Sequence, residues 1–414
     1  MPLNHFAPAT LDELRSIISK YSIKCSPEDP LPATVMKKNL ELLLPYWLDI
    51  VNLSLETGTI DGLKNAIIFP LLKEIGTDNN LLKNYRPVSN LQFISKLIER
   101  VVAARLDDHI GRNKLYSPNQ FGYKKWHCTE HLLLAVVDKL LMNCDKGMPS
   151  VILLLDMSAA FDTVDHDKML STLRNIGITG VALEWFRSFL TGRSFCVQIG
   201  ESISDFEQLL FGVAQGSVLG PRLFNIYVKP VYRDIEPLHF DIEGFADDHQ
   251  LVQAFLSQLQ YYALGDNIRR CLSVIGSWMN SHFLKLNESK TKIIVIAPPS
   301  VQSEIFIRGV FVTTECIRFS DIAKNLGLLI DSLLTFDSHI SSLTSACFSF
   351  IRKLHAIKVY LSMDHLKSLI CGNIFSRLDY CNALFYGLNA SSISKLQRVQ
   401  NDYIMVVFYK DDCT

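Results

Sequence analysis

The spacing of apolar residues predicts a chain of mixed helices and short strands. From Leu91 to Val102, apolar side chains recur at helical intervals after Ser89 and Asn90, either of which can cap a helix. The continuous apolar run 150–157 has strand length and is typical of a strand buried on both faces. Further helices are predicted at 36–55, 129–143, 166–176, 181–190, 220–228 and 258–280, with mainly helical structure from 338 onward.

Other apolar segments are predicted to be strands. They are 65–73, a hairpin joining 194–200 to 207–213, a hairpin within 241–255, a strand at 292–297 and a strand pair near 303–317. Helices and strands do not alternate regularly, and no internal repeat is present. The pattern therefore favours an α+β core with a helical C-terminal module.

The stretch "GFADDHQLV" (244–252) places two aspartates side by side within the predicted hairpin. Adjacent strand residues point to opposite faces, so Asp247 and Asp248 cannot both lie on the solvent side of a half-buried strand. One interpretation is that the pair forms the tight turn, where Asp is a favoured residue. The other is that the pair binds a metal ion, which requires a third carboxylate elsewhere.

Asp156 is the candidate for that third carboxylate. It closes the apolar run "VILLLD", where a charge is costly unless it is paired or bound to metal. Asp162 and Asp165 are better placed than Asp156 to cap the next helix. If Asp156 and the Asp pair lie on neighbouring strands, three carboxylates can hold two divalent ions for an in-line phosphoryl displacement.

Composition narrows the class of protein without deciding it. The 414 residues are 48% hydrophobic and 20% charged, which is typical of a globular chain with a sizeable core. No apolar run is long enough to span a bilayer, the first residues do not resemble a signal peptide, and the ten cysteines are expected to be reduced thiols. The net charge of −1 argues neither for nor against binding of nucleic acid.

Charge is unevenly distributed along the chain. Residues 83–125 contain nine Lys or Arg against three Asp or Glu, and residues 341–400 contain seven against two. Two basic regions around a less basic middle favour a polyanion held from two sides, although either region alone is compatible with an ordinary solvated surface.

Three motifs together resemble the palm motifs of reverse transcriptases from non-LTR (LINE-type, jockey-like) retrotransposons. They are "LLLDMSAAFDTVDH", "GVAQGSVLGPRLF" and "FADDHQL". Further blocks resemble the same polymerases in the same order, from about Ile23 to Asn401, among them "NYRPVSNLQFISKLIERVV", "LKLNESKTK" and "NLGLLIDSLLTFDSHI". The resemblance implies a right-hand polymerase of fingers, palm and thumb, with an antiparallel palm sheet and a helical C-terminal thumb. It divides the chain into an N-terminal extension (1–62), fingers and palm (63–300), and a thumb or connection region (301–414) that we expect to be truncated.

The resemblance also assigns roles to residues. Asp156 and Asp247 would be the principal ligands of two Mg²⁺ ions, with Mn²⁺ as an alternative, and Asp248 would lie beside them. Lys290 would act as general acid toward the leaving pyrophosphate. The residues that would contact the incoming deoxynucleotide are Lys73 and Arg86 on its triphosphate, Phe161 against a ribose 2′-hydroxyl, and Gln215 and Gly216 along the nascent base pair.

Several positions depart from the family pattern. Phe245, His249, Ala214 and Arg222 stand where the family usually has Tyr, Thr, Pro and a Leu-like residue, and no endonuclease domain is expected before residue 11. His249 has three interpretations: a protonated imidazole that competes with metal for Asp248, a neutral ring that binds softer metals and shifts the preference towards Mn²⁺, or a side chain that points into solvent.

The resulting hypothesis is an RNA-directed DNA polymerase with an RNA template, a DNA primer and dNTPs as partners, intracellular, with neither a membrane nor an evident protein partner. Two alternatives stay open. One is a decayed or co-opted copy that binds RNA without useful catalysis. The other is a cellular reverse transcriptase of the telomere type, against which the LINE-type blocks argue.

Overall fold

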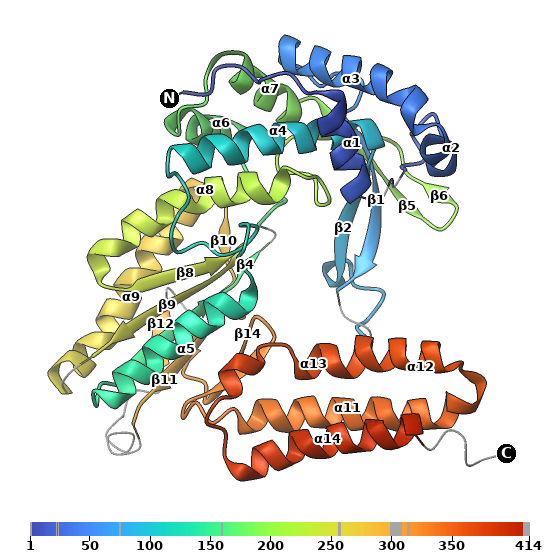
Figure 1. Cartoon of the computed structure of the whole chain (residues 1–414). Coiled ribbons are helices and arrows are strands. Elements are labelled where there is room, and N and C mark those ends of the chain that lie inside the picture. The colour runs from blue at the N-terminus through green and yellow to red at the C-terminus, as the bar shows by residue number, and fades with distance from the viewer. Residues whose placement is uncertain are drawn as a thin grey trace. The chain divides into compact units, whose positions relative to one another are not determined.

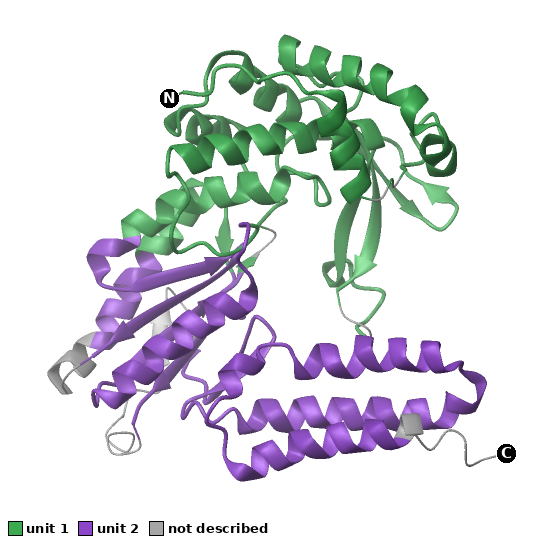
Figure 2. Ribbon diagram, viewed as in Figure 1, with its two compact units in different colours: residues 1–123, 157–234, 274–286 green, residues 124–156, 235–273, 287–414 purple. Residues whose placement is uncertain are grey.

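The computed structural model describes residues 2–21, 23, 25–73, 76–158, 160–255, 258–298, 309–312 and 315–408. The chain divides into two compact units, each assembled from three separate stretches (Figure 2). Unit 1 comprises Met1–Tyr123, Met157–Asp234 and Val274–Leu286, and unit 2 comprises Lys124–Asp156, Ile235–Ser273 and Asn287–Thr414. Each unit is described by itself.

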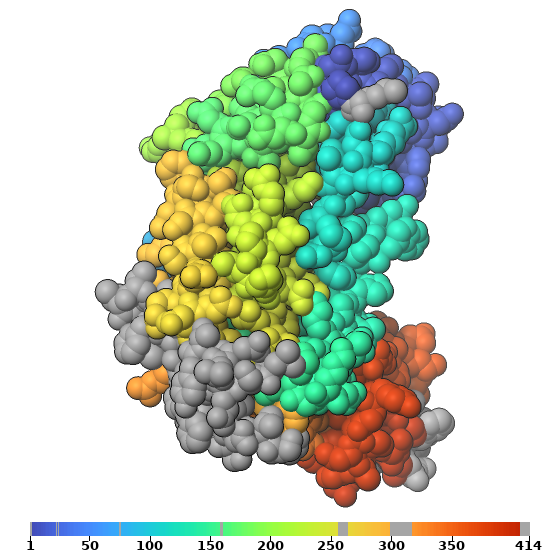
Figure 3. Space-filling view, turned by 90° about the vertical axis from the view of Figure 1, so that its left-hand side faces the viewer, coloured from blue at the N-terminus to red at the C-terminus, as the bar shows by residue number. Residues whose placement is uncertain are grey.

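Unit 1 is a helical layer attached to a sheet (Figure 1). Its helices are α1 (Leu11–Lys20), α2 (Ala33–Lys38), α3 (Leu40–Thr57), α4 (Phe93–Arg112), α6 (His166–Asn175), α7 (Gly180–Leu190) and α8 (Gly220–Ile235), with a 3₁₀ turn η1 (Leu82–Asn84). The N-terminal segment (dark blue in Figure 3) lies along α4 (cyan), where Arg105 donates to the carbonyl oxygens of Ala7 and Pro8. On α7, the ring of Trp185 stacks on the ring of Phe189, with 5.5 Å between the ring centroids.

The sheet of unit 1 has the strand order β2-β1-β5-β6, with β7 also paired to β5. Its strands are β1 (Asn65–Leu72), β2 (Tyr85–Leu91), β5 (Arg193–Ile199), β6 (Ser202–Ile203) and β7 (Glu207–Leu209). β1 is antiparallel to β2 and parallel to β5. A separate two-stranded ribbon pairs β4 (Met157–Ser158) with β10 (Lys285–Leu286).

Unit 2 is built around a four-stranded antiparallel sheet with the order β11-β3-β9-β8. The strands are β3 (Ser150–Leu155), β8 (Asp241–Phe245), β9 (Asp248–Ala254) and β11 (Lys292–Ile296). Every residue of β3 is buried, as expected for a central strand covered on both faces. Helix α5 (Thr129–Asp145) packs against β3 and β8 (Figure 1), and α9 (Gln258–Ser281) contributes its residues up to Ser273 to this unit.

The rest of unit 2 comprises two hairpins and a helical C-terminal module. The hairpins are β12 (Gly309–Val312) with β13 (Glu315–Arg318), and β14 (Ile322–Asn325) with β15 (Leu328–Asp331). The helices are α11 (Asp337–Ile357), α12 (Met363–Ile370), α13 (Ser376–Leu378) and α14 (Ala390–Phe408), with short turns η2 (Glu236–Leu238), η3 (Lys358–Tyr360), η4 (Cys371–Phe375) and η5 (Asn382–Phe385). Cys347, Ile351, Leu366 and Val399 belong to their shared apolar core.

The predicted α+β class, with an antiparallel sheet and a helical C-terminal region, is confirmed. The predicted cap of α4 was wrong, because Ser89 and Asn90 lie within β2. The Asp29 carboxylate instead accepts from the first amide of the helix, Phe93 N, at 2.9 Å. Part of the strand pair predicted near 303–317 lies outside the described residues. Within the described ranges, no helix combines the length and apolar content needed to cross a bilayer.

Candidate active site

Two of the predicted carboxylates come together in unit 2. Asp156 directly follows β3, and Asp248 opens β9, the neighbouring antiparallel strand. Leu155 pairs with His249, so Asp156 and Asp248 lie at the same end of two adjacent strands. Both line a recess of about 100 Å³, together with Leu154, Leu155, His249, Gln250, Lys290, Lys292, Lys324, Asn325 and Leu326. We call this the carboxylate recess.

The turn before β9 differs by one residue from the prediction. Phe245 pairs with Asp248, so the turn residues are Ala246 and Asp247, and Asp248 already belongs to the strand. Ala246 has a φ of 60°, in the left-handed region that two-residue hairpin turns require. Asp247 therefore lies at the tip of the hairpin and is not among the residues that line the carboxylate recess.

Several negative charges lie close together at the carboxylate recess. The side chain of Asp248 reaches solvent, yet displacement of water by the surrounding protein, followed by the negative charges of Asp247 and Asp156, raises its pKa to about 6. The Nζ atom of Lys290 lies 3.8 Å from Oδ2 of Asp156, and Lys290 is 66% exposed. A cation that bound between Asp156 and Asp248 would relieve their repulsion.

The donor set fits a hard divalent ion, because carboxylate oxygens are the ligands that Mg²⁺ prefers. Among the described residues, however, no group of three or more His, Cys, Asp or Glu side chains is arranged to hold a metal ion. The recess therefore brings two carboxylate donors together.

His249 is buried beside the two aspartates. It is 2% exposed, and its Nδ1 atom lies 3.1 Å from the carbonyl oxygen of Asp247. Burial lowers the pKa of the imidazole to about 4, so the ring is neutral at physiological pH. The predictions of a cation beside Asp248 and of a side chain in solvent were wrong, because the residue after the Asp pair is buried. The third, a neutral ring that binds softer metals, stays a prediction.

The predicted nucleotide-contacting residues lie in unit 1. Lys73 directly follows β1, and Arg86, on β2, pairs with Leu71 of β1. Both basic residues therefore lie at the same end of the β1–β2 pair. The Nζ atom of Lys73 donates to the carbonyl oxygen of Lys83 at 2.7 Å. The half-buried ring of Phe161 stacks on Phe224 with 4.7 Å between centroids and 27° between planes.

Gln215 and Gly216 form a loop pressed against β2. The carbonyl oxygen of Gln215 accepts from Ser89 N at 2.7 Å. Gly216 has a φ of +113°, and a Cβ there would lie 2.6 Å from the carbonyl oxygen of Ser89. Only glycine fits, which explains the residue type. Gln215 also lines an apolar cavity of about 520 Å³, with Pro70, Pro87, Phe195 and Leu209 among its walls.

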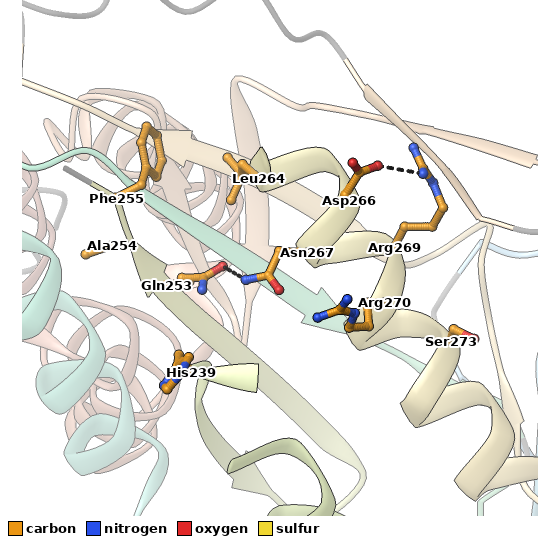
Figure 4. A pocket seen from close by; sticks show the side chains of 10 residues that line it. All are labelled: His239, Gln253, Ala254, Phe255, Leu264, Asp266, Asn267, Arg269, Arg270 and Ser273. Atoms are coloured by element: carbon orange, nitrogen blue, oxygen red, sulfur yellow. Dashed lines mark hydrogen bonds and ion pairs between the residues drawn. The ribbon is translucent and has the colours of Figure 1, made fainter. Parts of the chain in front are cut away.

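A larger recess of unit 2, about 900 Å³, contains none of the predicted residues (Figure 4). It lies at the other end of β9, beside Gln253, which accepts from Asn267 at 3.0 Å. Arg269 on its rim is paired with Asp266 at 2.8 Å. Exposed charges and amides without a convergent set of carboxylates make it a poor catalytic site, so the carboxylate recess is the candidate.

Comparison with known proteins identifies the family. The sequence pattern described as "Reverse transcriptase (RNA-dependent DNA polymerase)" matches residues 73–328, more than half of the chain. The chain belongs to the reverse transcriptase family. The predicted resemblance is thereby confirmed, and the three motifs that carry it all lie within the matched range.

Three curated relatives of this reverse transcriptase come from mobile elements of Drosophila melanogaster. The RNA-directed DNA polymerase from mobile element jockey is 26% identical over 93% of this chain and 42% of its own length. The probable RNA-directed DNA polymerases from transposon BS and transposon X-element are 26% and 25% identical, over 84% and 97% of this chain and 38% and 44% of theirs. The chain thus spans about two fifths of the length of these relatives.

Among solved structures, similarity extends to two telomerases. The telomerase of Candida albicans, in complex with a fragment of telomeric RNA, has a TM-score of 0.44 and 14% identity over 92% of this chain and 64% of that one. The apo telomerase of Candida tropicalis has a TM-score of 0.45 and 12% identity over 84% and 63%.

Sequence reasoning missed two acidic residues of this reverse transcriptase that contact the loop after Val213. Asp162, predicted as a helix cap, instead accepts from Nε2 of Gln215 at 2.8 Å, while Asp165 is the cap of α6. Glu99 on α4 is fully buried and accepts from Val218 N at 2.7 Å and Leu219 N at 3.1 Å. The sequence signal that could have identified Glu99 as a buried acid is its position among apolar residues at helical spacing.

Proposed function

We propose that this chain carries RNA-directed DNA polymerase activity of a LINE-like element, adding dNTPs to the 3′-hydroxyl of a DNA primer on an RNA template. The observation that carries the proposal is the convergence of Asp156 and Asp248 from adjacent strands, in a chain of the reverse transcriptase family. The raised pKa of Asp248 supports it, because crowded carboxylates are an arrangement that a divalent cation stabilises.

The family generally uses divalent metal ions, and we propose two Mg²⁺ ions held by Asp156, Asp247 and Asp248, with Mn²⁺ as the alternative. Such ions, when bound, stabilise the attacking and leaving oxygens of the displaced phosphoryl group. The exposed ammonium group of Lys290 would act as the general acid that protonates the leaving pyrophosphate. Lys73 and Arg86 supply charge-assisted hydrogen bonds to the triphosphate.

The other proposed nucleotide contacts depend on the shape and size of the residues that make them. The ring of Phe161, held by its stack on Phe224, would occupy the space of a ribose 2′-hydroxyl and so select deoxynucleotides. Gln215 and Gly216 would line the nascent base pair, where glycine permits close approach. We also propose the division into an N-terminal extension (1–62), fingers and palm (63–300) and a thumb region (301–414).

The alternative, a decayed copy that only binds RNA, gains no support from two of the unusual residues, Arg222 and His249, because the fold accommodates them. Arg222 pairs with Asp107 through Nε at 3.0 Å and Nη2 at 3.0 Å. His249 is buried and neutral rather than a charge in the recess.

Primer extension tests the proposal. The purified chain is incubated with an oligo(dT) primer on poly(rA), dTTP and either Mg²⁺ or Mn²⁺, beside the Asp156→Asn variant. Extension by the wild type but not by the variant is expected. RNA binding in a filter assay with no extension in either metal would support the alternative instead.

A further inference from the structure

The side-chain amide of Gln215 is oriented by a carboxylate. Its Nε2 atom donates to Oδ1 of Asp162 at 2.8 Å, across 53 positions of sequence. An ionised carboxylate can only accept hydrogen bonds, so the NH₂ group of the amide must face it. The carbonyl oxygen Oε1 is consequently directed away from Asp162. The chemistry of the partner therefore decides which end of the amide is presented, a choice that an amide alone leaves open.

Both residues of the pair are held in place by backbone contacts. Ser89 N donates to the carbonyl oxygen of Gln215 at 2.7 Å. On the other side, Gly212, with a φ of +87°, packs so closely on Asp162 that a Cβ would lie 2.8 Å from the Asp162 carbonyl oxygen. Val213 N donates to Phe161 O at 2.9 Å, tying the loop to the segment that precedes Asp162. Backbone contacts thus hold the loop against β2 on one side and against the segment around Asp162 on the other, which keeps the two side chains within hydrogen-bonding distance.

Capping of α6 does not explain Asp162. The cap is Asp165, which accepts from Lys168 N at 2.8 Å. Burial raises the pKa of Asp162, while the Gln215 bond and the positive charge of Lys73 oppose that rise. Keeping a partly buried carboxylate at this place costs stability, and Lys73 and Gln215 are both residues proposed to contact the nucleotide. Asp162 and Gln215 also line the same cavity of about 520 Å³.

We propose that Asp162 is a positioning residue that fixes the polarity of the Gln215 amide, so that the site offers a hydrogen-bond acceptor, Oε1, to an N–H or O–H group of the nucleotide. This inference rests on the proposed function, and it adds a specificity-determining residue to it. A neutral partner at position 162 would let the amide turn over, and half of the molecules would then present a donor where an acceptor is needed.

A charge-swapped pair tests the inference. Gln215→Glu alone sets two carboxylates against each other and removes the hydrogen bond. Asp162→Asn with Gln215→Glu restores it in reverse, because the Asn NH₂ donates to one Glu oxygen and leaves the other as the acceptor. Asp162→Asn alone leaves two equivalent amide orientations, so its KM for dNTP should rise only about twofold. Asp165→Asn is the matched control, since Asn caps a helix as well as Asp does.

The KM and kcat for dTTP are measured by primer extension, and the dissociation constant for dTTP by equilibrium binding, on variants with wild-type melting temperatures. We expect Gln215→Glu to raise KM and the dissociation constant by roughly tenfold, and the double variant to return both to within about threefold of wild type. A double variant no better than Gln215→Glu, in a chain whose wild type extends primers or binds dTTP, overturns this inference alone. A wild type that does neither overturns the proposed function and this inference together.

Discussion

The ammonium nitrogen of Lys290 lies 3.8 Å from Oδ2 of Asp156, and two further lysines, Lys292 and Lys324, line the same recess. Positive charge thus surrounds a pair of carboxylates that repel one another strongly enough to contribute to the raised pKa of Asp248. Such an arrangement can attract the phosphates of a substrate while the carboxylates keep affinity for a divalent cation.

Asp156→Asn should abolish primer extension and leave the fold intact. The amide is isosteric with the carboxylate but is a much weaker ligand, and metal stabilisation worth several kcal/mol corresponds to a loss of roughly a thousandfold or more. Extension rates and thermal melting are measured for both proteins. Asp165→Asn, the same substitution at the cap of α6, should retain full activity. Near-normal extension by Asp156→Asn would remove Asp156 from the site.

Phe161→Ala should admit ribonucleotides. The ring is fixed by its stack on Phe224, and its removal opens space where a 2′-hydroxyl is proposed to go. We expect the preference for dNTPs over rNTPs, measured as a ratio of kcat/KM values, to fall by roughly tenfold or more. Phe206→Ala, at an exposed position of the same unit, should leave the ratio unchanged. An unaltered ratio in Phe161→Ala would reduce Phe161 to a packing residue.

His249→Thr should not change the shape of the pH–rate profile. Because burial lowers the pKa of His249 to about 4, the imidazole is neutral from pH 6 to 8.5 and carries no titration into that range. Loss of the buried ring should lower the free energy of unfolding by about 1–3 kcal/mol. Profiles of the two proteins that diverge below pH 7 would show that His249 becomes charged in the working enzyme.

Local patterns predicted those parts of the fold that local physics decides. The buried strand β3 was predictable because all six of its residues are apolar or small, and the β8–β9 hairpin because its alternation is interrupted by turn residues. The cap of α4 was not predictable, since its acceptor, Asp29, is 64 positions away. The orientation of His249 depended on a turn placed one residue earlier than predicted.

Part of the candidate site was predictable for a similar reason. The convergence of Asp156 and Asp248 was predictable because a charge at the end of a buried strand suggests a metal site, and the pairing of β3 with β9 brings the second carboxylate beside the first. The hydrogen bond that motivates the proposed role of Asp162 could not be read from its neighbours in sequence, because its partner, Gln215, belongs to another loop. The burial of Glu99 likewise depends on packing around nearly the whole circumference of α4.

Glu99 is an acidic side chain placed where burial disfavours its charged form. It is fully buried, and its Oε2 atom accepts from the amides of Val218 and Leu219 just before α8, whose N-terminus favours negative charge. Burial raises the pKa of Glu99, and the charge of Arg193 and the two backbone donors only partly oppose the rise. Within the described residues, Oε1 has no hydrogen-bond partner. Desolvation is therefore the larger effect.

Glu99→Gln should make the protein more stable than wild type at high pH. Because the folded pKa of Glu99 is raised, ionisation costs stability, which wild type loses as the pH rises through that pKa; Gln keeps the acceptor for both amides and does not ionise. The difference in unfolding free energy, from urea titrations between pH 5 and 8.5, should grow with pH. Glu99→Leu leaves both backbone amides without an acceptor and should be roughly 2–4 kcal/mol less stable than Glu99→Gln at every pH. A Glu99→Gln protein that is less stable than wild type at pH 8.5 would show that the α8 N-terminus and Arg193 outweigh desolvation.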